Sequence, residues 1–321
     1  MRRNALVFAL TCSLIAVLLA APAKADYKQA VQEYNQGHYD KAMQAIKPDV
    51  EQNPDWEPGH RLLGLCYLNL KNYALAVSSF SRAVQLKSQS FSTYLGLGKA
   101  YYYMKNYDGC ISALNQGEPF SAKDRDADKA ALYKFRGSAY FKTNKLGEAI
   151  GDLTNALRMN QSDWGDFFML GSAYLGANRT DEAIQALEKA LSMKPGESTT
   201  TSLLGKAYLK KGTDSISAKQ YPAAMQELLK AKDYDPRNGY VYYNLAEIYL
   251  FEKKYPDMEK ALSQAIDLMP KSSGLYERLG LAYENQKKWD LALNAYKKAD
   301  EMGPSKEIKD AITRVTENKK R

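Results

Sequence analysis

Residues 164–195, WGDFFMLGSAYLGANRTDEAIQALEKALSMKP, hold the pattern that decides the fold. The first half repeats apolar and small residues at the i, i+3, i+4, i+7 spacing of one helical face: Phe167, Leu170, Gly171 and Tyr174. After a turn at 176–179, the second half continues in four- and three-residue steps: Ala183, Leu187 and Ala190. Pro195 ends this helix, because proline has no N–H to donate. So short a helix pair needs copies of itself to bury its apolar faces.

Copies of this pair recur along the chain. Their register residues, the small residues equivalent to Gly171, are Ala30, Gly64, Gly98, Gly137, Gly171, Gly205, Ala246 and Gly280. The steps between them are 34, 34, 39, 34, 34, 41 and 34 residues. Tyrosine follows three residues later in seven units: Tyr67, Tyr101, Tyr140, Tyr174, Tyr208, Tyr249 and Tyr283. Alanine follows twelve residues later in five units: Ala42, Ala76, Ala149, Ala183 and Ala292.

A helix–turn–helix period of 34 residues with these tyrosines, alanines and closing prolines resembles the tetratricopeptide repeat family. The resemblance implies an all-α fold, a right-handed α-solenoid of about eight repeats with a C-terminal capping helix. The predicted repeats are 26–55, 56–89, 90–128, 129–162, 163–196, 197–237, 238–271 and 272–304. The predicted capping helix, 305–321, has a narrow apolar stripe of Ile308, Ile312 and Val315.

Residues 1–25 have the composition of a secretory signal peptide. Arg2 and Arg3 precede an apolar run, and Ala23-Lys24-Ala25 gives a cleavage pattern before Asp26. This predicts a periplasmic or secreted protein. The alternative is an uncleaved N-terminal membrane anchor, for which the apolar run is somewhat short.

Composition and motifs argue against several other classes of protein. The net charge is +8, without the dense Lys/Arg stripe of a nucleic-acid binder. His38 and His60 are the only histidines. Neither belongs to a metal-ligand spacing, and neither lies beside a plausible nucleophile. We therefore expect no enzyme activity, no cofactor and no metal. Cys66 and Cys110 are left open as either a bridge or two buried thiols.

Two places depart from the regular repeat. Residues 116–128 hold five extra residues, are predicted as a loop by composition, and are a candidate hinge. Asp124, Asp126 and Asp128 have the spacing of the first three ligands of a calcium-binding loop. We instead interpret them as acidic residues at the start of a helix, where the helix dipole favours negative charge. Seven further residues around 212–218 predict either longer helices or a longer turn.

In this family the first helices line a concave groove. The resemblance therefore implies a binding stripe made of the residues three before, one after and four after each register residue. Seven of the 24 tyrosines have no packing role in the repeat, and six of these lie on or beside that stripe. Tyrosine concentrates at interfaces. The candidate groove residues are Tyr27, Tyr34, Arg61, Lys99, Tyr102, Tyr103, Lys134, Phe141, Phe168, Lys206, Lys210 and Tyr243.

The resemblance also suggests a two-carboxylate clamp, the set of lysines and asparagines with which some members of the family bind the C-terminal carboxylate of a partner. Arg61 and Lys134 are candidates for its basic side chains, but Leu65 and Ser138 occupy the positions where the clamp has asparagine. The predicted function is an exported scaffold that binds a partner protein or peptide and assists assembly of a cell-envelope complex. The alternatives are a membrane-anchored spacer and an enzyme with a site between repeats. The partner and the oligomeric state are not specified by the sequence.

The register predicts that Ala183 is fully enclosed between the two helices of its pair. Replacing Ala183 with leucine should overpack this contact and lower the free energy of unfolding by about 1–3 kcal/mol. Urea denaturation of Ala183→Leu beside the parent protein measures the difference. An unchanged unfolding midpoint would show that the register is misplaced.

Overall fold

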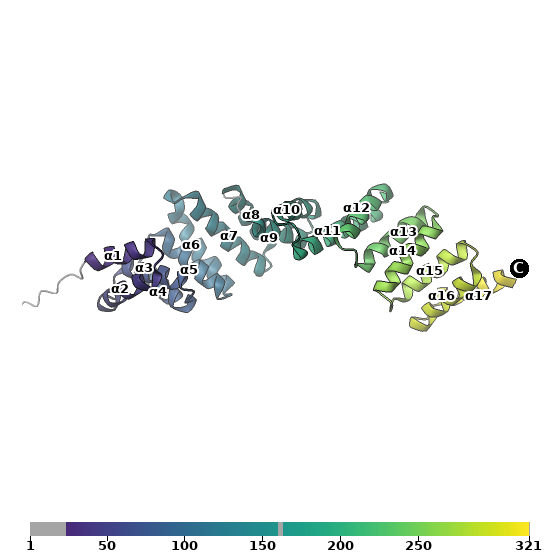
Figure 1. Ribbon diagram of the computed structural model, residues 1–321, viewed down its shortest axis with the longest axis horizontal. Coiled ribbons are helices and arrows are strands. Elements are labelled where there is room, and N and C mark those ends of the chain that lie inside the picture. Colours follow the sequence, from purple (N-terminus) through teal and green to yellow (C-terminus); the bar gives the residue numbers. More distant parts are fainter. Residues whose placement is uncertain (1–23, 160–162, 321) are drawn as a thin grey trace, which may run out of the picture. The chain divides into compact units, whose positions relative to one another are not determined.

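The computed structural model describes residues 24–159 and 163–320, and they form an all-α helical-repeat solenoid, as predicted (Figure 1). The predicted signal peptide lies outside the described residues, except that α1 begins at Lys24. Among the described helices, none is long and apolar enough to cross a membrane. The chain divides into two compact units, residues 1–123 and 124–321.

Unit 1 contains three helix pairs and a short 3-10 helix. Its elements are α1 (Lys24–Asn35), α2 (Tyr39–Gln52), α3 (Glu57–Asn69), α4 (Tyr73–Gln85), α5 (Phe91–Tyr103), α6 (Tyr107–Gly117) and η1 (Glu118–Lys123). Each helix packs on the next, and the first helices α1, α3 and α5 also contact one another in series. Phe80 and Ile46 are fully buried in its core.

Unit 2 contains five helix pairs and a final single helix. Its helices are α7 (Asp126–Lys142), α8 (Leu146–Met159), α9 (Trp164–Gly176), α10 (Thr180–Met193), α11 (Ser198–Ser217), α12 (Tyr221–Tyr234), α13 (Gly239–Phe251), α14 (Tyr255–Leu268), α15 (Ser273–Asn285), α16 (Trp289–Met302) and α17 (Lys306–Lys320). First helices α7, α9, α11 and α13 contact in series. Ile308 and Val315 of α17 are buried against Tyr296 of α16, so the last pair is covered.

The two helices of a pair approach closely at the register residue. A Cβ on Gly171 would lie 2.6 Å from Cγ of Leu187 and 3.2 Å from the carbonyl oxygen of Ala183, which is fully buried. A Cβ on Gly98 would lie 2.5 Å from the side chain of Leu114. Such separations leave no room for a methyl group. Small residues are therefore required at these positions by packing.

Every described first helix ends in the same turn. The N–H of Asn178 donates to the carbonyl of Leu175 (3.1 Å) and the N–H of Arg179 donates to that of Tyr174 (2.9 Å), the Schellman pattern. This pattern needs a left-handed residue, and φ is +59° at Asn178. The equivalent left-handed residues of the other turns are Gly37, Lys71, Lys105, Asn144, Lys219, Lys253 and Lys287. Lysine thus occupies a strained position in five turns.

The turn at Lys219 corrects the register of the sixth repeat. Lys219 follows Gly212 by the same seven residues that separate Asn178 from Gly171. A Cβ on Gly212 would meet Cγ of Leu228 at 2.8 Å, as one on Gly171 meets Leu187. The register residue is therefore Gly212 and not Gly205. The seven extra residues add two turns at the start of α11, which settles the choice between longer helices and a longer turn.

The composition of segment 116–128 predicts a loop, but the structure shows helical elements over most of it. Helix α6 continues to Gly117, η1 follows, and α7 begins at Asp126. Phe120 of η1 stacks on Tyr94 of α5, with ring centroids 5.3 Å apart, and this contact orders the segment. The boundary between the two units falls here, and a hinge at this place stays a prediction.

Other features of the sequence have plain structural roles. Asp128 lies in the first turn of α7 and accepts a hydrogen bond from Nε of Arg125 (3.0 Å). Cys66 and Cys110 are buried and are not joined by a disulfide, and burial raises the pKa of Cys66 to about 12. In the fourth repeat, the buried Arg136 and Asp152 form a two-pronged ion pair across α7 and α8, at 2.7 and 3.0 Å.

The strained turns predict a stabilising substitution. Lys253→Gly should raise the free energy of unfolding by about 0.5–1 kcal/mol, because glycine has no Cβ penalty at positive φ. Part of that gain is offset by the greater freedom of glycine in the unfolded chain. The matched control Lys260→Gly, inside α14, should lower stability by about 1 kcal/mol. Thermal unfolding measures both, and two changes of the same sign would contradict the role of the turn.

Candidate functional site

The side chains three before, one after and four after each register residue form what we call the first-helix face. In unit 1 it lies on α1, α3 and α5, and in unit 2 on α7, α9, α11, α13 and α15. Glu247 of this face, on α13, is joined by Arg278 of α15, which lies two residues before Gly280, with Nε 3.0 Å from Oε1. Burial raises the pKa of Glu247, which the charge of Arg278 partly offsets. Moving the register to Gly212 keeps Lys206 on this face, since seven residues are almost two turns.

Two candidate tyrosines of unit 1 are held by their neighbours. The Tyr27 ring packs edge-on against Trp56, with centroids 5.1 Å apart. The Tyr34 hydroxyl accepts a hydrogen bond from Nδ2 of Asn69 (3.1 Å), and its ring lies 5.3 Å from that of Tyr39. Burial raises the pKa of Tyr34. These rings therefore join adjacent helix pairs and leave only part of their surface for a partner.

The other candidates of unit 1 lie on α3 and α5. Nε of Arg61 is 3.4 Å from Oε1 of Glu57, so its charge is matched within its own helix. Lys99 is partly buried in the middle of α5. Tyr102 and Tyr103 form the end of that helix, and Tyr103 keeps 49% of its surface exposed.

Lys134 is engaged by two carboxylates that the sequence reasoning did not weigh. Nζ lies 3.0 Å from Oδ2 of Asp163 and 2.9 Å from Oδ1 of Asp166, both at the start of α9. Asp163 caps that helix by accepting from the N–H of Gly165 (3.0 Å). Lys134 therefore fastens α7 to α9 and does not offer a free positive charge. Arg61 is likewise paired with Glu57, so both basic residues considered for a carboxylate clamp already have carboxylate partners within the chain.

The three pKa values of this cluster follow from burial and pairing. Burial lowers the pKa of Lys134, but hydrogen bonds to Asp166 and Asp163 outweigh it, and the net shift is upward. Burial raises the pKa of Asp166, and Lys134 only partly opposes this. The pKa of Asp163 is lowered, first by the Gly165 N–H and then by Lys134. Asp166 is thus the member most dependent on the ammonium group.

The remaining predicted residues of unit 2 are partly buried or exposed. Lys210 pairs with Asp214 one turn later on α11, at 3.0 Å. Lys206 is exposed and has no carboxylate partner among the described residues. Phe141 packs against the core around Leu153, and the Phe168 ring lies 6.0 Å from that of Trp164. Of these, Lys206 offers the most accessible charge.

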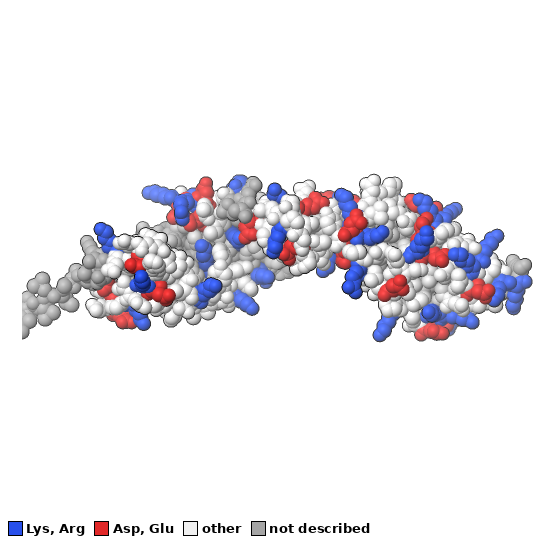
Figure 2. Space-filling view, in the orientation of Figure 1, with Lys and Arg blue, Asp and Glu red and all other residues white. Residues whose placement is uncertain are grey.

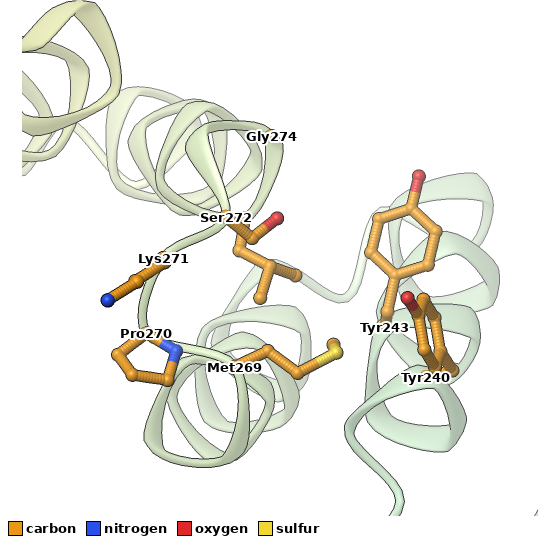
Figure 3. A pocket seen from close by; sticks show the side chains of 8 residues that line it. Tyr240, Tyr243, Met269, Pro270, Lys271, Ser272 and Gly274 are labelled. Atoms are coloured by element: carbon orange, nitrogen blue, oxygen red, sulfur yellow. The ribbon is translucent and has the colours of Figure 1, made fainter. Parts of the chain in front are cut away.

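Tyr243 opens on a cavity of about 560 Å³ in unit 2 (Figure 3). Tyr240 and Tyr243 come from the start of α13, which Asn238 caps through a hydrogen bond from the N–H of Tyr240 (3.2 Å). The opposite wall comes from the α14–α15 connection and the first turn of α15: Met269, Pro270, Lys271, Ser272, Gly274 and Leu275. We call this cavity the Tyr243 pocket.

The Tyr243 pocket is mainly apolar and open to solvent. Figure 3 shows Met269 pointing toward the two tyrosine rings, and Lys271 extending away from them. Met269 packs closely against α13: a Cβ added to Gly239 would lie only 2.7 Å from its Cε. Tyr240 keeps 63% of its surface exposed. The sequence reasoning found Tyr243 but missed Met269 and Leu275, since those residues occupy ordinary core spacings.

Charges of both signs are interspersed over the face seen in Figure 2. In the described parts of the chain, no group of three or more His, Cys, Asp or Glu side chains is arranged to hold a metal ion. The geometry therefore offers contact surface, an apolar pocket and scattered charges. Such features suit recognition of another macromolecule.

Comparison with known families agrees with this architecture. The pattern described as tetratricopeptide repeat matches residues 27–91, 136–198, 168–231 and 243–307. The chain belongs to the tetratricopeptide repeat family. This confirms the predicted resemblance and makes the chain a protein–protein interaction scaffold. The tetratricopeptide fold is typically a non-enzymatic scaffold.

Individual relatives of this tetratricopeptide repeat protein are distant. The Protein SGT1 homolog of Bos taurus is 27% identical over 85 residues, covering 26% of this chain and 25% of that protein. The Hsp70-Hsp90 organising protein of Plasmodium falciparum (isolate 3D7) is 24% identical over 155 residues, covering 40% of this chain and 28% of that protein. The matches thus span about a quarter of each curated relative.

A solved structure, Naa15/Naa10 bound to HypK-THB, matches with a TM-score of 0.56 and 16% identity. The match covers 89% of this chain and 43% of that one. At this identity it supports the tetratricopeptide fold alone.

The Lys134 cluster predicts a pH-dependent loss of stability in Lys134→Met. Without the ammonium group, the mostly buried Asp166 is ionised and unpaired at pH 7, which should cost about 1–3 kcal/mol. Because burial raises the pKa of Asp166, the penalty should shrink as the pH falls toward 4 and that carboxyl takes up a proton. Urea unfolding at pH 7 and pH 4 measures this.

The matched control is Lys206→Met on α11, which should change stability by less than about 0.5 kcal/mol at either pH. A Lys134→Met penalty that stayed constant between pH 7 and pH 4 would contradict the assignment of the loss to Asp166.

Proposed function

We propose that this tetratricopeptide repeat protein is an exported scaffold that holds a segment of a partner protein on the first-helix face of unit 2. A bulky apolar side chain of the segment enters the Tyr243 pocket. By holding that segment, the scaffold assists assembly of a cell-envelope complex. The Tyr243 pocket is the observation that carries the proposal.

The size and lining of the pocket favour such an anchor. Its volume of about 560 Å³ lies within the range of about 300–1,000 Å³ typical of ligand sites. Tyr240 and Tyr243 give large contact area with few rotatable bonds, and their hydroxyls can hydrogen-bond to a bound backbone. The thioether of Met269 adapts to the shape of an entering side chain. An apolar anchor with a polar surround is the usual plan of a binding hot spot.

Export is supported by the sequence of residues 1–25, with its basic start, apolar run and cleavage pattern before Asp26. The partner would then be another protein of the periplasm or of the secretory route. A relative, the Hsp70-Hsp90 organising protein, is named for the proteins on which it acts. That name supports a protein partner and does not identify one.

A photoreactive residue, p-benzoylphenylalanine, placed at position 240 tests the pocket inside cells. We expect one crosslinked envelope protein, identified by mass spectrometry, from position 240. The matched control is the same probe at Phe251, which is equally exposed at the other end of α13 and should not give that product. In the position-240 protein, Tyr243→Ala should lower the yield about tenfold, because truncating a central aromatic anchor removes most of the binding energy.

Further controls separate the alternatives. Leu291→Ala, an exposed residue on α16, should leave the yield unchanged. Equal crosslinking from positions 240 and 251, or a yield insensitive to Tyr243→Ala, would place partner binding elsewhere. N-terminal sequencing of the native protein should begin at Asp26. A start at Met1 would favour the membrane-anchored spacer.

A further inference from the structure

A chain of four tyrosine rings crosses one edge of unit 1. Tyr73 begins α4, Tyr102 and Tyr103 end α5, and Tyr107 begins α6. Tyr73 stacks on Tyr103 with centroids 4.9 Å apart and planes inclined by 23°. Tyr103 meets Tyr102 edge-on at 5.9 Å, and Tyr102 meets Tyr107 edge-on at 5.7 Å. We call these four residues the tyrosine ladder.

The ladder continues into exposed apolar surface. Tyr103 is 49% exposed, and Met104, the next residue in the chain, is 48% exposed. Single exposed apolar residues are common on protein surfaces, but several together mark an interaction site. The ladder joins two successive helix pairs of unit 1. The ladder belongs to unit 1 and the Tyr243 pocket to unit 2, and they share no residue, so substitutions can test the two surfaces separately.

Two lysines flank the ladder. Lys71 and Lys105 are the left-handed residues of successive turns, with φ of +61° and +60°, two residues before Tyr73 and Tyr107. Both side chains are exposed, and neither has a carboxylate partner among the described residues. The ladder therefore carries positive charge near both ends, which favours a ligand with acidic flanks.

We propose that the tyrosine ladder binds a proline-rich segment of a partner protein, in the polyproline II conformation and flanked by acidic residues. This helix has three residues per turn and rises about 3.1 Å per residue, so one face repeats every ~9 Å. Successive ring centroids of the ladder are 4.9, 5.9 and 5.7 Å apart, which is less than one such repeat, so each turn of the segment has a ring to pack against.

The chemistry of the rings fits the same ligand. Proline rings pack against aromatic faces, and aromatic-lined surfaces are a general way to read polyproline II segments. Carbonyl groups of a polyproline II helix have no internal hydrogen bonds. The phenol hydroxyls of Tyr73 and Tyr107 can donate to them. A bound strand would instead need an unpaired sheet edge, and the described part of unit 1 is entirely helical between its turns.

The test is fluorescence anisotropy with a labelled peptide of six prolines flanked by two glutamates at each end. The control peptide has glycine in place of alternate prolines, which removes the preformed helix. We expect the purified protein to bind the proline peptide at least about tenfold more tightly than the control. Tyr103→Ala should raise Kd about tenfold or more. Tyr103→Phe keeps the ring and should give a smaller rise.

The matched control variant is Phe251→Ala in unit 2. Phe251 stacks on Tyr221 at 3.8 Å and 23°, the same relation of helix ends as Tyr103 on Tyr73. It should leave Kd within about twofold of the parent value. Lys71→Asn/Lys105→Asn removes the charges and keeps the turns, since Asn144 and Asn178 hold the equivalent left-handed positions. This variant should bind severalfold more weakly and lose most of the salt dependence.

Several results would overturn the proposal. The proline peptide could bind no better than the glycine peptide, or Tyr103→Ala could bind as the parent does. Sedimentation could instead show self-association that Tyr103→Ala abolishes, making the ladder a contact between copies. A Tyr103-dependent affinity for an acidic polysaccharide such as polygalacturonate, without affinity for the peptide, would assign the ladder to a glycan. Unchanged circular dichroism and melting temperature show that each variant is folded.

Discussion

The structure depends on the close approach of two helices at one small residue. At Gly171 a single added carbon would lie 2.6 Å from Leu187, so the distance between the helices is set by the absence of a side chain. The left-handed turn that follows fixes where the second helix starts, because its hydrogen bonds allow only one path of the chain. Repeating this geometry brings successive first helices into contact. The pocket and the ladder exist because side chains from neighbouring helices then converge.

The part of this arrangement that is local in sequence could be predicted. The 34-residue period, the small register residues and the helical faces all follow from spacing, and they specify the fold class. What could not be predicted depends on contacts between distant residues. Lys134 lies on the expected face, but Asp163 and Asp166 reach it from the next repeat and change it from a ligand contact into a structural ion pair. Tyr243 was found, whereas Met269 and Leu275 on the opposite wall look like ordinary core residues in the sequence.

The sixth repeat shows why register can be ambiguous in a helix. Gly205 and Gly212 are seven residues apart, so both lie on nearly the same face of α11, and the sequence pattern cannot choose between them. Two observations select Gly212: Leu228 packs against it, and the turn at Lys219 follows it by the same seven residues that separate Asn178 from Gly171. In the same way, polar composition predicted a loop at 116–128, while the stacking of Phe120 on Tyr94 orders a 3-10 helix there. Tertiary contacts outweighed local preference in both places.

The two irregular steps of this chain show how a repeat array can change its length. Seven extra residues rotate an α-helix by nearly two full turns, so α11 grows and still presents its apolar face to its neighbours. Five extra residues would turn that face by roughly 140°, at about 100° per residue, and expose the core. Of the five residues added before the fourth pair, four lengthen the start of α7, which begins eleven residues before Gly137, whereas α9 begins seven before Gly171. Four residues are close to one turn of helix, and the remaining one lies in the connection that contains η1. The angular period of the helix thus acts as a filter on insertions: lengths close to whole turns are accepted within a helix.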